Sequence, residues 1–243
     1  LFIYANTANE DYIFLIDASP SMGEATPYVS IMSRFIADKL PKNTNIGVVS
    51  FSKQVKTISL LEKKTEKLDV ALSDIELLSP AGISIKEALE SCISVFEDSN
   101  KSKIIIMFTG VDKKYKLSEE LNDTADILQK NNITLYAIGF WKNMSNNDIP
   151  ESLEKYASNK SYEITTIERQ GLDEEFLYNL TNRSGGKFYK LDNISLMENI
   201  TNSLTHETKT KTNIELWKYF LIATVLLLAI EWTLGMTKYK TLP

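Results

Sequence analysis

Cysteine and histidine are almost absent from this chain of 243 residues, which has one of each, Cys92 and His206. A single cysteine excludes a disulfide within the chain and a cysteine-rich metal site, and a single histidine removes most zinc sites and most catalytic arrangements built on imidazole. An excess of positive charge is missing too, because the net charge is -5 and the Lys and Arg residues are scattered. Nucleic-acid binding is therefore not expected.

Extremes of composition are also missing. The charged fraction of 24% and the hydrophobic fraction of 43% are those of an ordinary folded protein, so neither a disordered chain nor one embedded wholly in a membrane is indicated. The length suits one α/β domain of roughly 180 to 200 residues with an appendage.

Apolar runs of strand length alternate with amphipathic helical patterns along most of the chain. Such an alternation predicts an α/β fold with a doubly wound, mostly parallel sheet. Because only Ser52 and Lys53 separate two of the runs, they should form a hairpin whose second strand is antiparallel at the sheet edge. The predicted strands are 11–17, 45–51, 54–60, 103–110, 133–140 and 186–191, and the predicted helices are 28–40, 65–77, 84–97, 118–131, 172–184 and 194–204.

The remaining segments define the predicted boundaries of the domain, which covers 11–205. Residues 142–171 fit the alternation least well and are interpreted as an insertion, with a short helix near 150–158 and a strand pair near 161–167. Residues 1–10 are apolar and then polar, so they could be the end of a membrane or signal segment. A polar tether, 206–216, precedes an apolar segment, 217–236, and a short tail, 237–243.

The apolar segment predicts a single C-terminal membrane-spanning helix. Its core, 219–236, has eighteen residues and would reach roughly 27 Å as a helix, against a hydrocarbon thickness of about 30 Å. Glu231 opposes insertion by on the order of 3 kcal/mol, whereas eight large apolar side chains favour it by about 4 kcal/mol together. Trp217 and Trp232 stand where interfacial aromatic anchors would. The alternative is a buried core helix, and the flanking charges do not settle the orientation.

A carboxylate and two hydroxyls follow the first predicted strand on alternate residues. Asp17, Ser19 and Ser21 lie within the run DASPS, and a ligand of an open α/β sheet binds beyond the carboxyl ends of the strands. Hard oxygen ligands of this kind suit Mg²⁺ or Mn²⁺. The alternative reading is helix capping and turn formation by Asp and Ser.

Asp-x-Ser-x-Ser after an apolar first strand, in this order of strands and helices, resembles the metal-ion-dependent adhesion site of von Willebrand factor A domains. The C-terminal part, from LDEEFLYNLTNRSGGKFYKL to LLLAIEWTLGM, is similar to membrane-anchored prokaryotic proteins of the Bat (aerotolerance operon) type. The resemblance implies a six-stranded Rossmann-like domain that binds other proteins in a membrane-associated complex. It also implies that the domain lies outside the cytoplasm.

Two positions depart from the family's site. The family also uses a threonine from a later loop, where this chain has Ile83, and an aspartate after the fourth strand, where it has Gly110. Ser84 and Asp112 are the nearest stand-ins. Since divalent oxygen sites depend on how many charged ligands they collect, metal binding here is expected to be weak.

Three functions are compatible with these patterns. The first is a membrane-anchored protein-interaction module, with or without a divalent cation and with no small-molecule substrate. The second is a metal-independent structural subunit of a membrane complex. Ile83 and Gly110 favour it, because they stand where the family has metal ligands. The third, favoured least, is a hydrolase with Asp17 as nucleophile. Since Ser19 replaces the second acid of an Asp-x-Asp phosphatase motif, and no phosphate-binding glycine loop is present, an enzyme is not expected.

Overall fold

The computed structural model describes residues 10–23, 25–63, 66–73, 75, 83–97, 99–115, 117–140, 153, 156, 171–192 and 196–238. The chain divides into two units, Leu1–Asn202 and Ser203–Pro243. The first contains the sheet, and the second contains most of the last helix.

The first unit is built on a six-stranded sheet of order β3-β2-β1-β4-β5-β6. All neighbouring strands are parallel except β2 and β3, which form the predicted antiparallel hairpin at one edge. The α/β class with one antiparallel edge strand is therefore confirmed. The strands are β1 (Glu10–Asp17), β2 (Asn45–Phe51), β3 (Val55–Lys63), β4 (Ser102–Thr109), β5 (Ile133–Phe140) and β6 (Phe188–Leu191).

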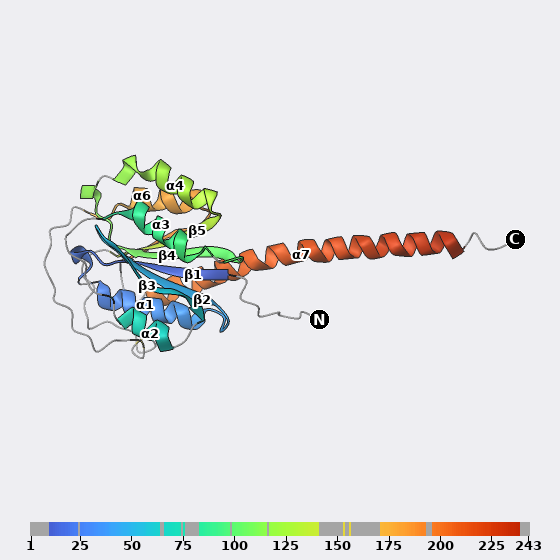
Figure 1. The fold of residues 1–243 in the computed structure, drawn as a ribbon, viewed down its shortest axis with the longest axis horizontal. Coiled ribbons are helices and arrows are strands. Elements are labelled where there is room, and N and C mark those ends of the chain that lie inside the picture. The colour runs from blue at the N-terminus through green and yellow to red at the C-terminus, as the bar shows by residue number, and fades with distance from the viewer. Residues whose placement is uncertain are drawn as a thin grey trace. The chain divides into compact units, whose positions relative to one another are not determined.

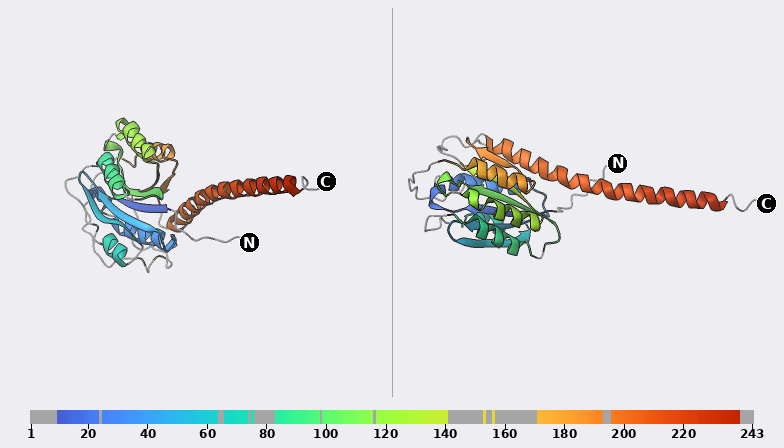
Figure 2. Two further views of the ribbon diagram at one scale, coloured as in Figure 1. Left: turned by 45° about the vertical axis from the view of Figure 1, so that its right-hand side comes forward. Right: turned by 90° about the horizontal axis from the view of Figure 1, so that it is seen from above.

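Helices cover both faces of this sheet. Figure 1 and the two views of Figure 2 show α1 and α2 on one face and α3, α4 and α6 on the other. The central strands are apolar along their length because both of their faces are covered. The α-helices are α1 (Thr26–Lys39), α2 (Glu66–Ser73), α3 (Ile85–Val95), α4 (Leu121–Lys130), α6 (Glu174–Arg183) and α7 (Leu196–Lys238), and the 3-10 helices are η1 (Pro20–Met22), η2 (Lys113–Tyr115) and η3 (Leu117–Glu119).

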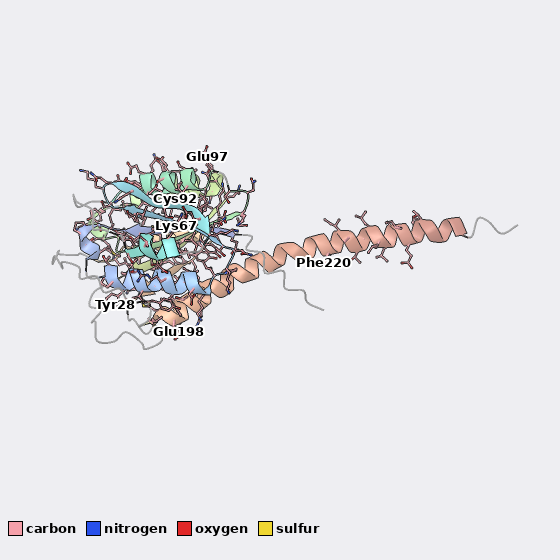
Figure 3. All side chains as sticks on the ribbon, turned by 60° about the horizontal axis from the view of Figure 1, so that its bottom comes forward. Tyr28, Lys67, Cys92, Glu97, Glu198 and Phe220 are labelled. Carbon is pink, nitrogen blue, oxygen red and sulfur yellow. The ribbon has the colours of Figure 1, made fainter. Side chains whose placement is uncertain are left out.

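Alternate residues of β1 pack into two different layers, as the two-residue period of a strand requires. Ile13 and Leu15 belong to the core shared with α3, α4 and α6, in which Cys92 is also fully buried (Figure 3). Phe14 points to the other face, and its ring packs edge-on against that of Phe108, with centroids 5.8 Å apart. Both layers hold β1 at the centre of the domain.

A buried acid fixes the amino end of β1. Asp11 is 3% exposed, and its carboxylate accepts hydrogen bonds from Asn45 Nδ2 (2.9 Å), Ser99 Oγ (2.7 Å) and Lys101 Nζ (2.9 Å). These partners come from the start of β2 and the loop before β4. The network therefore ties three adjacent strands together at the edge of the sheet opposite to Asp17.

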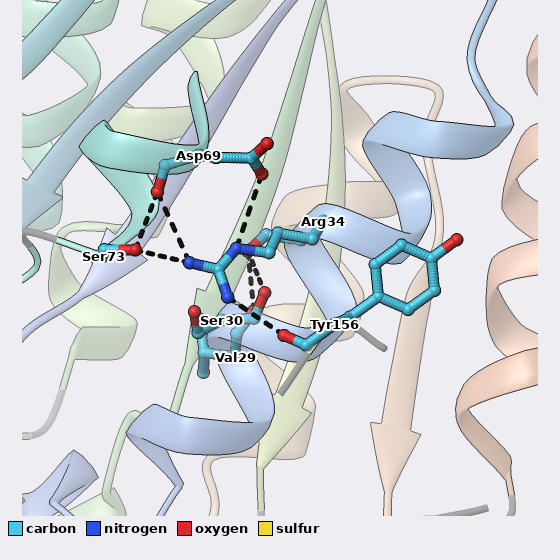
Figure 4. A network of polar contacts seen from close by, with 7 residues as sticks. Val29, Ser30, Arg34, Asp69, Ser73 and Tyr156 are labelled. Atoms are coloured by element: carbon cyan, nitrogen blue, oxygen red, sulfur yellow. Dashed lines mark hydrogen bonds and ion pairs between the residues drawn. The ribbon is translucent and has the colours of Figure 1, made fainter. Parts of the chain in front are cut away.

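A clamp around Arg34 of α1 connects the predicted insertion to the helices (Figure 4). The Arg34 guanidinium donates to the carbonyl oxygen of Tyr156 (2.9 Å) and to Ser73 Oγ (2.5 Å) of α2, and pairs with Asp69 (3.5 Å). The Tyr156 ring packs against Phe35, with centroids 5.5 Å apart. The rest of the insertion, including the helix near 150–158 and the strands near 161–167, lies outside the described residues, save Leu153 and Gly171.

The C-terminal helix is longer than predicted. α7 begins at Leu196, passes through 206–216, the segment predicted as a polar tether, and continues to Lys238. In the part of the chain that the structure describes, no helix combines the length and apolar character needed to cross a membrane. The membrane-spanning helix predicted over 217–236 is therefore not confirmed.

A stretch of α7 nevertheless carries exposed apolar side chains. Phe220, labelled in Figure 3, is 75% exposed. The other large ones are Leu221, Ile222, Val225, Leu226, Leu227, Leu228, Ile230 and Trp232.

Candidate functional site

Sheet topology brings the ends of β1 and β4 together. After β1 the chain forms β2 and β3 on one side of β1, and then forms β4, β5 and β6 on its other side. The strand order thus reverses between β1 and β4, and the carboxyl ends at such a point form the usual ligand crevice of an open α/β sheet. Asp17 is the last residue of β1, and Thr109 is the last residue of β4.

Asp17 joins these two strand ends. Its carboxylate is 2% exposed; one oxygen, Oδ2, accepts hydrogen bonds from the Thr109 hydroxyl (2.9 Å) and the Gly110 backbone N–H (3.1 Å). The other, Oδ1, accepts from the Ser19 N–H (3.0 Å). The bond from the Ser19 N–H is a local turn bond, as the alternative of turn formation by Asp and Ser predicted. The bonds from Thr109 and Gly110 come instead from the end of β4, which is distant in sequence.

The two serines predicted as ligands also lie together. The hydroxyl oxygens of Ser19 and Ser21 are 2.8 Å apart and hydrogen-bonded to one another, and both residues are buried. Although Ser19 precedes η1, its side chain makes no capping hydrogen bond. The helix-capping alternative therefore does not account for Ser19.

Ile83, at the family's threonine position, is partly buried and packs against the core shared with α3, α4 and α6. The two positions suggested as stand-ins are Ser84 and Asp112. Ser84 precedes α3, and its N–H donates to the Ser52 carbonyl (2.9 Å). Asp112 is buried, its Oδ1 accepts from the Lys114 N–H (3.0 Å), and its backbone pairs with Leu172 in an isolated bridge.

Backbone hydrogen bonds connect the loops at this edge. The Ala18 N–H donates to Phe51 (2.7 Å), which ties the loop after β1 to the end of β2. The Lys113 N–H donates to Gly171 (2.8 Å), and the Asp173 N–H donates to Val111 (2.9 Å). We call the joined segments 18–23, 52–54, 83–84, 110–115 and 171–173 the rim. Thr109 and Ser52, which bond to Asp17 and Ser84, are among the residues of this edge that were not predicted as part of a site.

The sequence of this domain matches a known family along most of its length. The model of the von Willebrand factor type A domain matches residues 11–175. The chain belongs to this family. The resemblance predicted from the Asp17 motif is thereby confirmed. A search of curated proteins found no match to the chain.

Solved A domains have the same fold. BatB from Bacteroides thetaiotaomicron is 19% identical, with a TM-score of 0.60 over 82% of this chain and 98% of that one. An aerotolerance-related membrane protein from Bacteroides fragilis is 15% identical, with a TM-score of 0.57 over 81% and 98% of the two chains. A mussel byssus protein, proximal thread matrix protein 1 with zinc in its adhesion site, is 17% identical, with a TM-score of 0.58 over 81% and 46%.

A divalent cation, which A domains can bind at this edge, does not suit the side chains of this chain. Among the described residues, no group of three or more His, Cys, Asp or Glu side chains could hold a metal ion. Ser19 and Ser21 would supply two neutral oxygens, and three protein donors already occupy Asp17. The Ile83 side chain has no ligand atom, and Gly110 has no side chain where a carboxylate would be needed.

Proposed function

We propose that this A domain is a protein-interaction module of a membrane-associated assembly, that it docks its partner on the rim, and that it catalyses no reaction. One observation carries the proposal: Asp17 bonds across the reversal of strand order to Thr109 and Gly110, so the loops on both sides form one surface. Loops held in place on a rigid sheet are the usual position for binding residues.

The geometry favours binding over hydrolysis. A nucleophilic carboxylate needs an oxygen open to the substrate and a nearby group that moves protons. Asp17 is 2% exposed and accepts three hydrogen bonds, so neither of its oxygens faces a substrate. Its environment suits a residue that positions loops.

The docking proposal is tested by site-specific photo-crosslinking of the full chain in its native membranes. A photoreactive residue at exposed Lys53 or Lys113 of the rim should give the same discrete adduct. Lys42 is the matched control, since it is an equally charged, exposed residue before β2, at the opposite edge of the sheet. Adducts of one pattern from all three positions, or none from the rim, would contradict docking there.

Attachment to the membrane is proposed to occur through the apolar stretch of α7. Large apolar side chains occupy seven of the nine positions from Phe220 to Leu228, so they surround the helix instead of forming a stripe, which suits an apolar environment on all sides. The hydroxyls of Thr224 and Thr233 donate to the carbonyls of Phe220 (2.7 Å) and Ile230 (2.8 Å). They therefore need no water. The name of the B. fragilis relative, a membrane protein, agrees with this proposal.

Flotation of the full chain with phosphatidylcholine vesicles tests the attachment. The wild-type chain should float with the vesicles, and Leu227→Lys with Leu228→Lys should remain in the dense fraction, since each lysine opposes insertion by about 3 kcal/mol. The control pair is Leu60→Lys with Val70→Lys, because Leu60 and Val70 are 63% and 58% exposed on the first unit. If the α7 pair floats like the control pair, the apolar stretch is not the anchor.

A further inference from the structure

We infer that the adhesion site of this A domain works without a metal ion, and that Asp17 acts there as a hydrogen-bond acceptor that joins β1 to β4. The inference concerns the rim but does not depend on the identity of a partner. It rests on four features of the described residues, which are the oxygens of Asp17, the donors that face them, the two serines, and the two departures from the family pattern.

The Asp17 oxygens are nearly saturated. An ionised carboxylate can accept about four hydrogen bonds in all. Oδ2 accepts from the Thr109 hydroxyl and the Gly110 N–H, at 2.9 and 3.1 Å, and Oδ1 accepts from the Ser19 N–H at 3.0 Å. One acceptor direction on Oδ1 therefore remains, and a cation bound there would have a carboxylate already shared among three donors.

The hydrogen-bond donors around Asp17 stabilise its negative charge, as a bound cation would otherwise do. Backbone N–H groups and hydroxyls that point at a buried carboxylate stabilise its negative charge. Thr109 cannot easily turn away from Asp17, because its hydroxyl oxygen also accepts the Val111 N–H (3.1 Å). The first residues after β4 thus hold Asp17 with their own donors, and the negative charge needs no metal ion to balance it.

The serines satisfy each other as well. Their hydroxyl oxygens are buried and hydrogen-bonded to one another at 2.8 Å, so each hydroxyl has a partner without a cation. Neutral hydroxyls contribute no charge to a divalent site, and the affinity of such sites depends on ligand charge.

The two departures from the family pattern remove the remaining ligands. The Ile83 side chain packs against the core cluster, and Gly110 has no side chain, so neither position supplies an oxygen ligand from its side chain. Binding Mg²⁺ or Mn²⁺ would require dehydration without enough oxygen ligands in return. Partner docking on this rim is accordingly insensitive to chelators.

The test is a Mn²⁺ titration of the full chain in detergent micelles, followed by electron paramagnetic resonance of the free ion. The wild-type chain should show no saturable binding up to about 1 mM, the weak end of natural divalent sites. Its unfolding midpoint should be the same in Mg²⁺ and in a chelator. Saturable Mn²⁺ binding that Asp17→Asn abolishes would overturn the inference.

Restoring the missing ligands gives the complementary test. Ile83→Thr with Gly110→Asp should gain saturable Mn²⁺ binding, whereas the control pair, Ile83→Val with Gly110→Ala, should bind none. If the restored pair folds and still binds nothing, ligand loss is not the reason and the inference fails. Ile83→Asp alone, which adds a carboxylate and leaves Gly110 unchanged, serves the same test should the Gly110→Asp substitution prevent folding. Failure of rim docking would appear in the crosslinks and not in these titrations.

Discussion

Replacing Asp17 with Asn should destabilise the domain strongly, because the amide group cannot accept all three hydrogen bonds that the carboxylate accepts. In the better orientation the amide oxygen faces Thr109 and Gly110, and the NH₂ group meets the Ser19 N–H. One buried donor then loses its acceptor, at a cost of about 1–3 kcal/mol, and the other two bonds lose charge assistance worth about 1 kcal/mol each. The free energy of unfolding should fall by about 3–5 kcal/mol.

Urea unfolding of the full chain in micelles, followed by circular dichroism with chelator present, measures this loss. Asp126→Asn is the matched control, since Asp126 is exposed on α4, and it should change the free energy of unfolding by less than about 0.5 kcal/mol. Thr109→Val combined with Asp17→Asn completes a double-mutant cycle, in which a coupling of about 1 kcal/mol or more is expected. If Asp17→Asn is as stable as the control, or if Mg²⁺ restores its stability, the reasoning is wrong.

Three further predictions concern residues away from the rim. Asp11→Ala should lower the free energy of unfolding by about 3–5 kcal/mol, because the partly buried Lys101 loses its partner; urea titration checks this, and a change near zero would contradict it. Burial raises the pKa of the Cys92 thiol far above its ordinary value, so a disulfide reagent at pH 8 should label the chain in urea and not the native protein. Gly186→Ala places a Cβ 1.8 Å from the Leu135 carbonyl oxygen, and should cost about 3 kcal/mol or more, whereas Gly47→Ala, whose Cβ would lie 3.2 Å from Val95 Cγ1, should cost less in thermal unfolding.

Local patterns were enough to predict the sheet. The run KIIIMFTG is apolar throughout because helices cover both faces of β4, and the short turn at Ser52 and Lys53 leaves no room for a crossover between β2 and β3. The turn after α6 depends in the same local way on Gly185, whose φ of 75° favours glycine. Such features depend on neighbours in sequence, so they are visible without the structure.

The bonds of the site were not predictable in the same way. Thr109 lies 92 residues after Asp17, and the two meet only because the strand order places β4 beside β1. The strongest available signal was the family resemblance, which expects an aspartate at the position of Gly110, directly after Thr109. Similarly, the polar segment 206–216 was predicted as a tether, although Lys and Glu are also good helix formers, and the structure has it inside α7.

The backbone bonds between Lys113 and Gly171, and between Asp173 and Val111, fix one end of the insertion to the rim, while β5 fixes the other end in the sheet. A chain segment with both ends fixed can change its length at little thermodynamic cost, because the closure entropy grows only with the logarithm of length. Sequence can therefore be gained or lost between Phe140 and Gly171 without disturbing the Asp17 bonds, provided that the bond from Arg34 to the Tyr156 carbonyl is kept. Related chains can differ in length there while they keep the same sheet.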